Sequence, residues 1–270
     1  EGGSRKTSLK TPIQNHSDAL ALILRTLVDP EVGVIKDIAE IGAVGHRVVH
    51  GGEEFVESTL ITDDVVKTIE RFSDLAPLHN PPNLTGIRSA RAVLGSVPHV
   101  AVFDTAFHQT MPPSAYIYAL PYQLYEKYRV RRYGFHGTSH RYVTMKAAEM
   151  LGKPLQDTNV ITCHLGNGCS ITAVRDGKSV DTSMGFTPLE GVVMGTRCGD
   201  VDPAVIFFLA GKEGSLGDIN GMLNKKSGLI GISGVSNDMR QVKDAADKGN
   251  ARARLAIDVY AYRIRKYIGA

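Results

Sequence analysis

This sequence has few cysteines, no long apolar run and almost no surplus of one charge. Its 270 residues include three cysteines, Cys163, Cys169 and Cys198, too few for the disulfide framework of a small secreted protein. No stretch approaches the roughly 18 consecutive apolar residues of a membrane span, and no basic-then-apolar signal sequence opens the chain. We therefore expect a protein of the reducing cytoplasm that makes no use of a membrane.

The charge balance argues against a partner of strong opposite charge. Lys+Arg number 31 and Asp+Glu 28, which gives a formal net charge of +3. No run of basic residues interleaved with aromatics supports nucleic-acid binding. With 43% apolar and 22% charged residues, the chain has the composition of a globular protein of one large or two medium domains.

The spacing of apolar and turn residues predicts alternating helices and strands, and therefore an α/β protein. We expect strands at residues 44–49, 99–103, 159–164, 170–174 and 179–181, and helices at 18–27, 62–72, 84–94, 142–151, 203–209, 216–223 and 251–267. Thr62 is the expected cap of its helix, and Asp176-Gly177 the expected hairpin turn between the last two strands. Prolines in residues 77–83 predict an exposed loop before the helix at 84, because each proline lacks an N–H donor. The change of pattern places a domain boundary between Phe107 and Asp157.

One glycine turn is a candidate phosphate site. Gly166-Asn167-Gly168 stands between two expected strands, where backbone N–H groups can converge on an anion. An ordinary hairpin turn is the commoner explanation of such a sequence. Walker A and G-x-G-x-x-G motifs are both absent, so the two familiar nucleotide folds lose support.

Histidines and arginines lie in unusual surroundings. His46/His50 and His136/His140 are each four residues apart, but H-E-x-x-H is missing and the flanking residues disfavour a zinc-binding helix. His136 instead lies in a loop rich in glycine and polar residues, which makes it a candidate site residue.

Three further residues complete this set. Arg47 and Arg197 are flanked by glycines, and an arginine held in this way presents a two-pronged donor to carboxylate or phosphate. Asp104 ends a buried strand, either as a cap or as a carboxylate facing a cleft. Each residue has an ordinary explanation, a surface charge or a cap, but together they indicate a site that handles anions.

Six motifs in order resemble the acetate kinase family closely, and the similarity runs from about residue 14 to the end. They are GHRVVHGGE at 45–53, LAPLHNPP at 75–82, VFDTAFHQTMP at 102–112, RYGFHGTSH at 132–140, CHLGNG at 163–168 and DTSMGFTPLEG at 181–191.

The resemblance implies a two-domain α/β fold shared with sugar kinases, actin and heat-shock ATPases. Each domain would be a mixed sheet flanked by helices, with the active site in the cleft between domains. Residues 1–108 would belong to the acetate-binding domain and residues 109–270 to the nucleotide-binding domain.

The resemblance also implies roles for individual residues. Arg47 and Arg197 match arginines that bind the substrate carboxylate and steady the transferring phosphoryl group, Asp104 matches the catalytic aspartate, and His136 the histidine that stabilises the transition state. The residues that match the family's ATP site are His164, Leu165, Gly166, Asn167, Gly168, Asp238, Met239 and Arg240. Those that match the pocket for the acetate methyl group are Val49, Leu78, Phe135 and Pro188, and His79 is a further substrate-binding residue.

The implied reaction is ATP + acetate ⇌ ADP + acetyl phosphate by direct in-line transfer, with Mg²⁺ or Mn²⁺, in a cytoplasmic homodimer. Two alternatives stay open: a propionate or other short-chain acyl kinase, and a non-catalytic nucleotide-binding fragment. The family's Ser-rich phosphate loop and its G-G-I-G-E-N segment are both missing, so we expect a partial chain whose metal ligands lie in the missing termini and which is poorly active alone.

Overall fold

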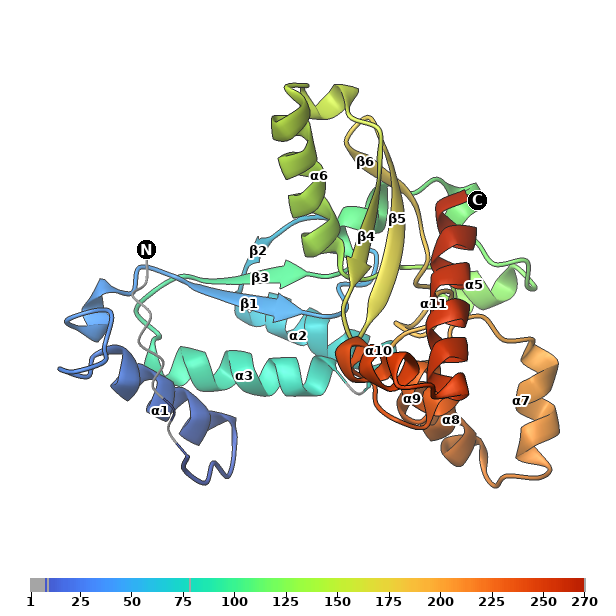
Figure 1. Ribbon diagram of the computed structural model, residues 1–270. Coiled ribbons are helices and arrows are strands. Elements are labelled where there is room, and N and C mark those ends of the chain that lie inside the picture. The colour runs from blue at the N-terminus through green and yellow to red at the C-terminus, as the bar shows by residue number, and fades with distance from the viewer. Residues whose placement is uncertain (1–7, 9, 78, 270) are drawn as a thin grey trace. The chain divides into compact units, whose positions relative to one another are not determined.

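A computed structural model describes residue 8, residues 10–77 and residues 79–269 (Figure 1). The chain forms two compact units, residues 1–103 and residues 104–270. Each unit contains a three-stranded sheet with helices packed beside it. The α/β architecture expected from the sequence is thus present in both units.

The sheet of the first unit is mixed. Strand β3 (His99–Phe103) is its central strand, parallel to β1 (Val44–Val48) and antiparallel to β2 (Thr59–Leu60). Side chains of β3 alternate between buried and partly buried, because successive residues point to opposite faces of a strand. Helix α3 (Asn80–Val93) packs against β1. It also contacts the other two helices seen beside it in Figure 1, α1 (His16–Leu27) and α2 (Asp63–Arg71).

The start of α3 corrects one prediction. We expected a loop through residue 83, but the helix begins at Asn80 with Pro81 and Pro82 in its first turn. The first N–H groups of a helix have no partner within it, so proline costs no hydrogen bond there. Asn80 is buried, and its side chain bonds both the N–H and the carbonyl oxygen of His50. These bonds fix the helix start beside β1.

The sheet of the second unit is antiparallel throughout its described strands. Their order is β4 (Val160–Leu165), β5 (Cys169–Arg175) and β6 (Lys178–Thr182). The predicted hairpin at Asp176 and Gly177 is confirmed, and both residues have the positive φ, 53° and 72°, that a tight two-residue turn requires. Helix α6 (Gly137–Leu151) packs against β4.

The remaining helices of the second unit vary from four to 19 residues. They are α4 (Pro113–Tyr116), α5 (Gln123–Tyr128), α7 (Pro203–Ala210), α8 (Leu216–Lys225), α9 (Gly228–Ser233), α10 (Met239–Asp247) and α11 (Ala251–Gly269). The sequence predicted α7, α8 and α11 but missed the other four. None of the helices within the described ranges is both long and apolar enough to pass through a bilayer.

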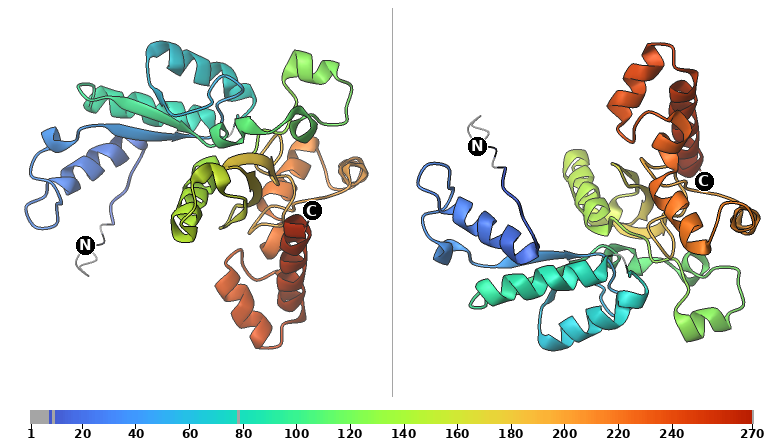
Figure 2. Two further views of the ribbon diagram at one scale, coloured as in Figure 1. Left: turned by 90° about the horizontal axis from the view of Figure 1, so that it is seen from above. Right: turned by 90° about the horizontal axis from the view of Figure 1, so that it is seen from below.

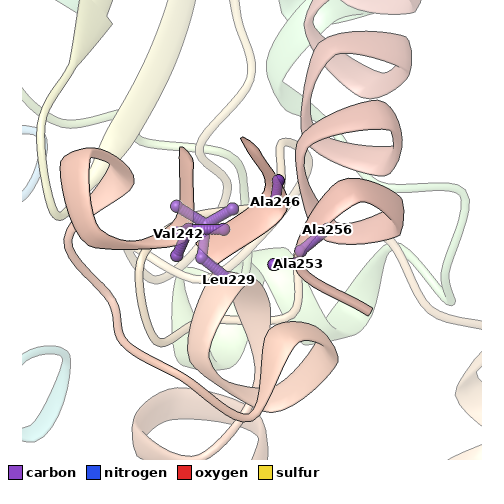
Figure 3. Close-up of a cluster of buried hydrophobic side chains, with 5 residues drawn as sticks. All are labelled: Leu229, Val242, Ala246, Ala253 and Ala256. Atoms are coloured by element: carbon purple, nitrogen blue, oxygen red, sulfur yellow. The ribbon is translucent and has the colours of Figure 1, made fainter. Parts of the chain in front are cut away.

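Helices α9, α10 and α11 share a small apolar core. Figure 2 shows α10 and α11 beside each other at one end of the second unit. Between the helices lie five buried side chains, Leu229, Val242, Ala246, Ala253 and Ala256 (Figure 3). Three of the five are alanines, which let helix backbones approach closely. Leu229 and Val242 therefore supply most of the apolar volume of this core.

We expect Leu229→Ala to lower the free energy of unfolding of the second unit by about 2–5 kcal/mol, because it leaves a cavity that the alanines cannot fill. The measurement is urea unfolding followed by circular dichroism. Leu255→Ala is the control, since Leu255 lies on α11 but is 53% exposed, and its effect should stay within about 0.5 kcal/mol. Equal effects of the two substitutions would contradict this account of the core.

Candidate active site

His136 stands directly before α6 in a backbone conformation that only glycine adopts easily. Its φ is 58°, in the left-handed region. The next residue, Gly137, donates its N–H to the carbonyl oxygen of Asp104 at 2.9 Å. A Cβ at Gly137 would lie 2.3 Å from that oxygen, so a larger residue does not fit. The strained histidine is thereby held next to the buried Asp104, and such strain is often found at functional sites.

Two serine hydroxyls fix the imidazole rings of this region. The ring of His136 stacks on that of His164, with centroids 4.0 Å apart. His136 Nδ1 lies 2.9 Å from Ser170 Oγ, and His164 Nδ1 lies 2.9 Å from Ser139 Oγ. His136 and His164, which the sequence placed in separate motifs, therefore lie side by side in defined orientations.

The predicted phosphate turn joins β4 to β5, where Leu165 pairs with Cys169. The turn is closed by the N–H of Gly166, which donates to the carbonyl oxygen of Gly168 at 3.1 Å. Asn167 ties it to a second loop, because its carbonyl oxygen accepts from Gly195 N–H at 3.0 Å. A Cβ at Gly195 would lie 2.2 Å from Asn167 Oδ1, so a larger residue there would displace the Asn167 side chain.

Arg197 and His136 converge on this turn. A Cβ built on Gly168 would lie 3.2 Å from Arg197 Nη1 and 3.3 Å from His136 Cε1. Arg197 Nη1 also donates to the carbonyl oxygen of Pro188 at 3.1 Å, which orients the guanidinium. Burial lowers the pKa of Arg197, yet an arginine stays charged at physiological pH. Among the described residues no carboxylate forms an ion pair with it, so a bound anion would complete its environment.

The expected adenosine segment lies next to the same turn. Asn237 Nδ2 donates to Asn167 Oδ1 at 2.8 Å. The following residue, Asp238, caps α10 by accepting from Arg240 N–H at 2.9 Å and pairs with the Arg240 side chain. Met239, the first residue of the helix, is partly buried. The start of α10 is therefore anchored to the turn through Asn237.

The residues predicted to hold the acyl group are divided between the two units. In the first unit Val49 is buried and its N–H donates to Asn83 Oδ1 at 3.1 Å, while Arg47 lies exposed on β1. His79 precedes α3 in the same unit, and Leu78 lies outside the described residues. In the second unit Phe135 is 2% exposed and adjoins His136, and Pro188 bonds Arg197.

Sequence reasoning missed the small polar residues that orient the site. Ser139, Ser170 and Asn237 each bond a predicted site residue. A serine in a strand or a helix has no distinctive local pattern, so nothing in the sequence marked them. His140 carried a signal, its spacing of four from His136, but we considered only a metal site for that pair. It instead lies within α6, and His136 caps that helix.

The residues present fit a metal ion that is held largely by a substrate. Within the described ranges no group of three or more His, Cys, Asp or Glu side chains is arranged to hold an ion. Magnesium bound to a nucleotide needs only one or two protein carboxylates, because phosphate oxygens and water supply its other ligands. Asp104, buried beside Gly137, is a carboxylate suited to that role.

Two buried histidines lie behind His136, and both are neutral at pH 7. Burial lowers the pKa of His108 to about 4, and its Nε2 donates to the carbonyl oxygen of Phe135 at 3.0 Å. Burial, together with the neighbouring histidines, lowers the pKa of His140 to about 2. Their rings meet edge to face at 5.8 Å. These two histidines therefore contribute hydrogen bonds behind His136 and no charge at neutral pH.

Comparisons with known proteins identify relatives of this chain. A sequence model described as the acetokinase family matches residues 1–270. A protein named acetate kinase from Alkaliphilus metalliredigens is 60% identical over 269 residues, which cover 99% of this chain and 68% of that protein. One of the same name from Thermotoga maritima is 60% identical over 270 residues, covering 99% and 67%.

Solved structures show the same relation. The chain matches an acetate kinase from Porphyromonas gingivalis with a TM-score of 0.90 and 53% identity, over 94% of this chain and 64% of that one. It matches a propionate kinase from Francisella tularensis with a TM-score of 0.88 and 49% identity, over the same shares. The predicted fold is thus confirmed, and the chain spans about two thirds of the length of these relatives.

Stability should fall as the pH drops below the ordinary histidine pKa of about 6.5. The unfolded chain then binds protons on His108 and His140, whereas the folded chain resists them down to about pH 4 at His108 and about pH 2 at His140. Each imidazole should lower the free energy of unfolding by up to roughly 1.4 kcal/mol per pH unit over pH 6 to 4. Urea unfolding across this range measures the slope.

His108→Gln removes one of these groups and should make the slope shallower. His16→Gln, at the exposed first residue of α1, should leave the slope unchanged. An identical slope in wild type and His108→Gln would show that burial of His108 does not govern the acid sensitivity.

Proposed function

The chain belongs to the acetokinase family, and on that premise we propose that the protein transfers a phosphoryl group reversibly between ATP and acetate, forming ADP and acetyl phosphate. The observation that carries the proposal is the convergence of Arg197 and His136 on the turn at Gly168. Phosphoryl transfer asks the protein mainly to position the reactants and to offset charge on the moving group. Two fixed donors beside the proposed phosphate turn would position the phosphoryl group and offset its charge.

The acceptor needs no catalytic base in this scheme. Acetate is ionised at pH 7, because carboxylic acids titrate near ~4, so its oxygen is ready to attack the γ-phosphorus in line. Arg47, on the first unit, is proposed to bind the acetate carboxylate. Asp104 is then assigned to orienting an arginine or the metal's water shell rather than to abstracting a proton.

The nucleotide is proposed to lie along the turn and the start of α10. The turn of residues 164–168 would face the phosphates, and Asp238, Met239 and Arg240 would contact the adenosine. The bond from Asn237 to Asn167 supports this, because it fixes these two segments together. Mg²⁺ or Mn²⁺, when bound to the phosphates with Asp104 in its shell, would neutralise part of their charge.

A propionate or other short-chain acyl kinase is the second candidate. It is favoured by the similarity to the propionate kinase from Francisella tularensis. Acetate and propionate differ by one methylene, worth ~1–3 kcal/mol of discrimination in an apolar pocket. The proposed pocket wall of Val49, Leu78, Phe135 and Pro188 would set the choice, with His79 as a further substrate-binding residue. The resemblance to the family also underlies the proposals of a homodimer and of a cytoplasmic location.

The proposal is tested by ADP formation from ATP and Mg²⁺ with acetate, propionate or butyrate. The assay uses this chain and the whole protein, extended to the length of its relatives. We expect acetate to give the highest kcat/KM in the whole protein, with less activity in the shorter chain. Arg197→Ala should lower kcat about 10²–10³-fold, since removing one donor to a developing negative charge costs ~2.7–4 kcal/mol.

Arg254→Ala is the matched control, because Arg254 lies on α11, is mostly exposed and pairs with Asp247. It should retain full activity. Absence of turnover in the whole protein with all three acids, while ATP still binds, would refute the kinase proposal and leave a nucleotide-binding role.

Val49→Ala should enlarge the acyl pocket and raise activity on propionate relative to acetate. The removed methyl groups leave room for the extra methylene, so we expect the ratio of the two kcat/KM values to shift by about 10-fold. The control is Val56→Ala, at an exposed valine of the same unit, which should not alter the ratio. An unchanged ratio in Val49→Ala would remove Val49 from the pocket wall.

A further inference from the structure

A continuous hydrogen-bonded chain runs from the sheet of the second unit to His136. Thr162 Oγ1 on β4 lies 2.7 Å from His140 Nδ1, and His140 Nε2 lies 2.7 Å from Ser170 Oγ on β5. Ser170 Oγ then lies 2.9 Å from His136 Nδ1. Three side chains of two strands and one helix thus connect in sequence to one nitrogen of the candidate catalytic histidine.

The linking residues lie behind the site rather than in it. Thr162 is 4% exposed, His140 1% and Ser170 0%. They approach His136 at Nδ1, whereas its Cε1 and Nε2 face Gly168 and come within 3.3 and 3.4 Å of a Cβ built there. Any influence of these three residues on a ligand at the turn must therefore pass through His136.

This hydrogen-bonded chain of side chains restricts which ring nitrogens of the two histidines carry protons. His140 is neutral because burial depresses its pKa, so one of its two nitrogens carries a proton and the other accepts one. The Thr162 hydroxyl has a near acceptor in His140 Nδ1 at 2.7 Å and a far one in the carbonyl oxygen of Thr172 at 3.5 Å. The near one is favoured, because a contact of 3.5 Å is at the limit of a hydrogen bond.

That choice fixes the rest of the chain. If Thr162 donates to Nδ1 of His140, Nε2 of His140 donates to Ser170, and the Ser170 hydroxyl donates to Nδ1 of His136. The single proton of a neutral His136 is then on Nε2, the nitrogen that faces the turn. The reverse direction would place a lone pair of neutral His136 there, opposite the oxygens of a phosphate.

We propose that Thr162, His140 and Ser170 are positioning residues that hold His136 as the neutral tautomer with its proton on Nε2, ready to donate to a phosphoryl oxygen. This inference rests on the proposed function for the identity of the acceptor. Arg197 supplies positive charge next to His136, because both side chains approach the same point at Gly168. The site would thus combine one charged and one neutral donor.

Thr162 offers a sharp test, because two substitutions separate its hydroxyl from its shape. Thr162→Val keeps the shape and removes the hydroxyl, while Thr162→Ser keeps the hydroxyl and removes the methyl group. In the whole protein we expect Thr162→Val to lower kcat about 10–100-fold, by analogy with the loss on removing a partner that orients a metal-binding histidine. KM for ATP and acetate should stay unchanged, and Thr162→Ser should remain close to wild type.

Thr172→Val is the matched control. Thr172 pairs with Thr162 across the two strands, and its hydroxyl is equally buried but bonds Thr182 instead of a histidine. It should leave kcat unchanged. Equal losses in Thr162→Val and Thr172→Val, or a larger loss in Thr162→Ser than in Thr162→Val, would assign Thr162 to packing and overturn the proposal.

The tautomer itself is read from the ¹⁵N spectrum of protein labelled at histidine, since protonated and unprotonated ring nitrogens give distinct shifts. A His136→Gln variant identifies the signals of His136. We expect a proton on Nε2 in wild type and a mixture of tautomers in Thr162→Val. A proton on Nδ1, or on both nitrogens, in wild type would overturn the inference. The spectrum needs no turnover, so it decides the hydrogen-bonded chain even where the kinase assay fails.

Discussion

The close approach at Gly168 is the constraint on which the second unit depends. Its turn must lie within van der Waals distance of Arg197 and of the ring of His136, and a side chain there would enter the space between them. Three segments far apart in sequence have to agree for this to happen: the β4 to β5 turn, the start of α6 and the loop after residue 194. Most hydrogen bonds of the site hold these three in place.

The charge distribution follows from the same packing. Arg197 is half-buried, and the two histidines behind His136 are forced to remain neutral by burial. Arg197 supplies positive charge at the Gly168 turn, and these histidines supply none. Buried His140 and His108 therefore contribute hydrogen bonds rather than charge, at the cost of stability in acid. This makes acid sensitivity a consequence of how the site is built.

Several local features of the fold could be predicted from the sequence, because few residue types suit the backbone conformations that they require. The Asp176-Gly177 turn and the Thr62 cap were recognised since only a few residue types suit those backbone positions. The predicted start of α3 was wrong because Asn80 is held by hydrogen bonds to His50, which is distant in sequence. Helices α9 and α10 were missed because their apolar faces are narrow and are completed by alanines of α11. Ser170 and Thr162 were missed because a buried hydroxyl in a strand is defined by its neighbours alone.

The comparison with relatives indicates which part of the site would distinguish acetate from propionate. Proteins named acetate kinase and propionate kinase match this chain with TM-scores of 0.90 and 0.88, so the fold is common to both names. The donors to a phosphoryl group serve either acid, because the transferred group is the same. What differs is one methylene at the far end of the acceptor, and a preference of ~1–3 kcal/mol is within the reach of one or two side chains. Under our proposal Val49, whose N–H donates to Asn83, is one such side chain.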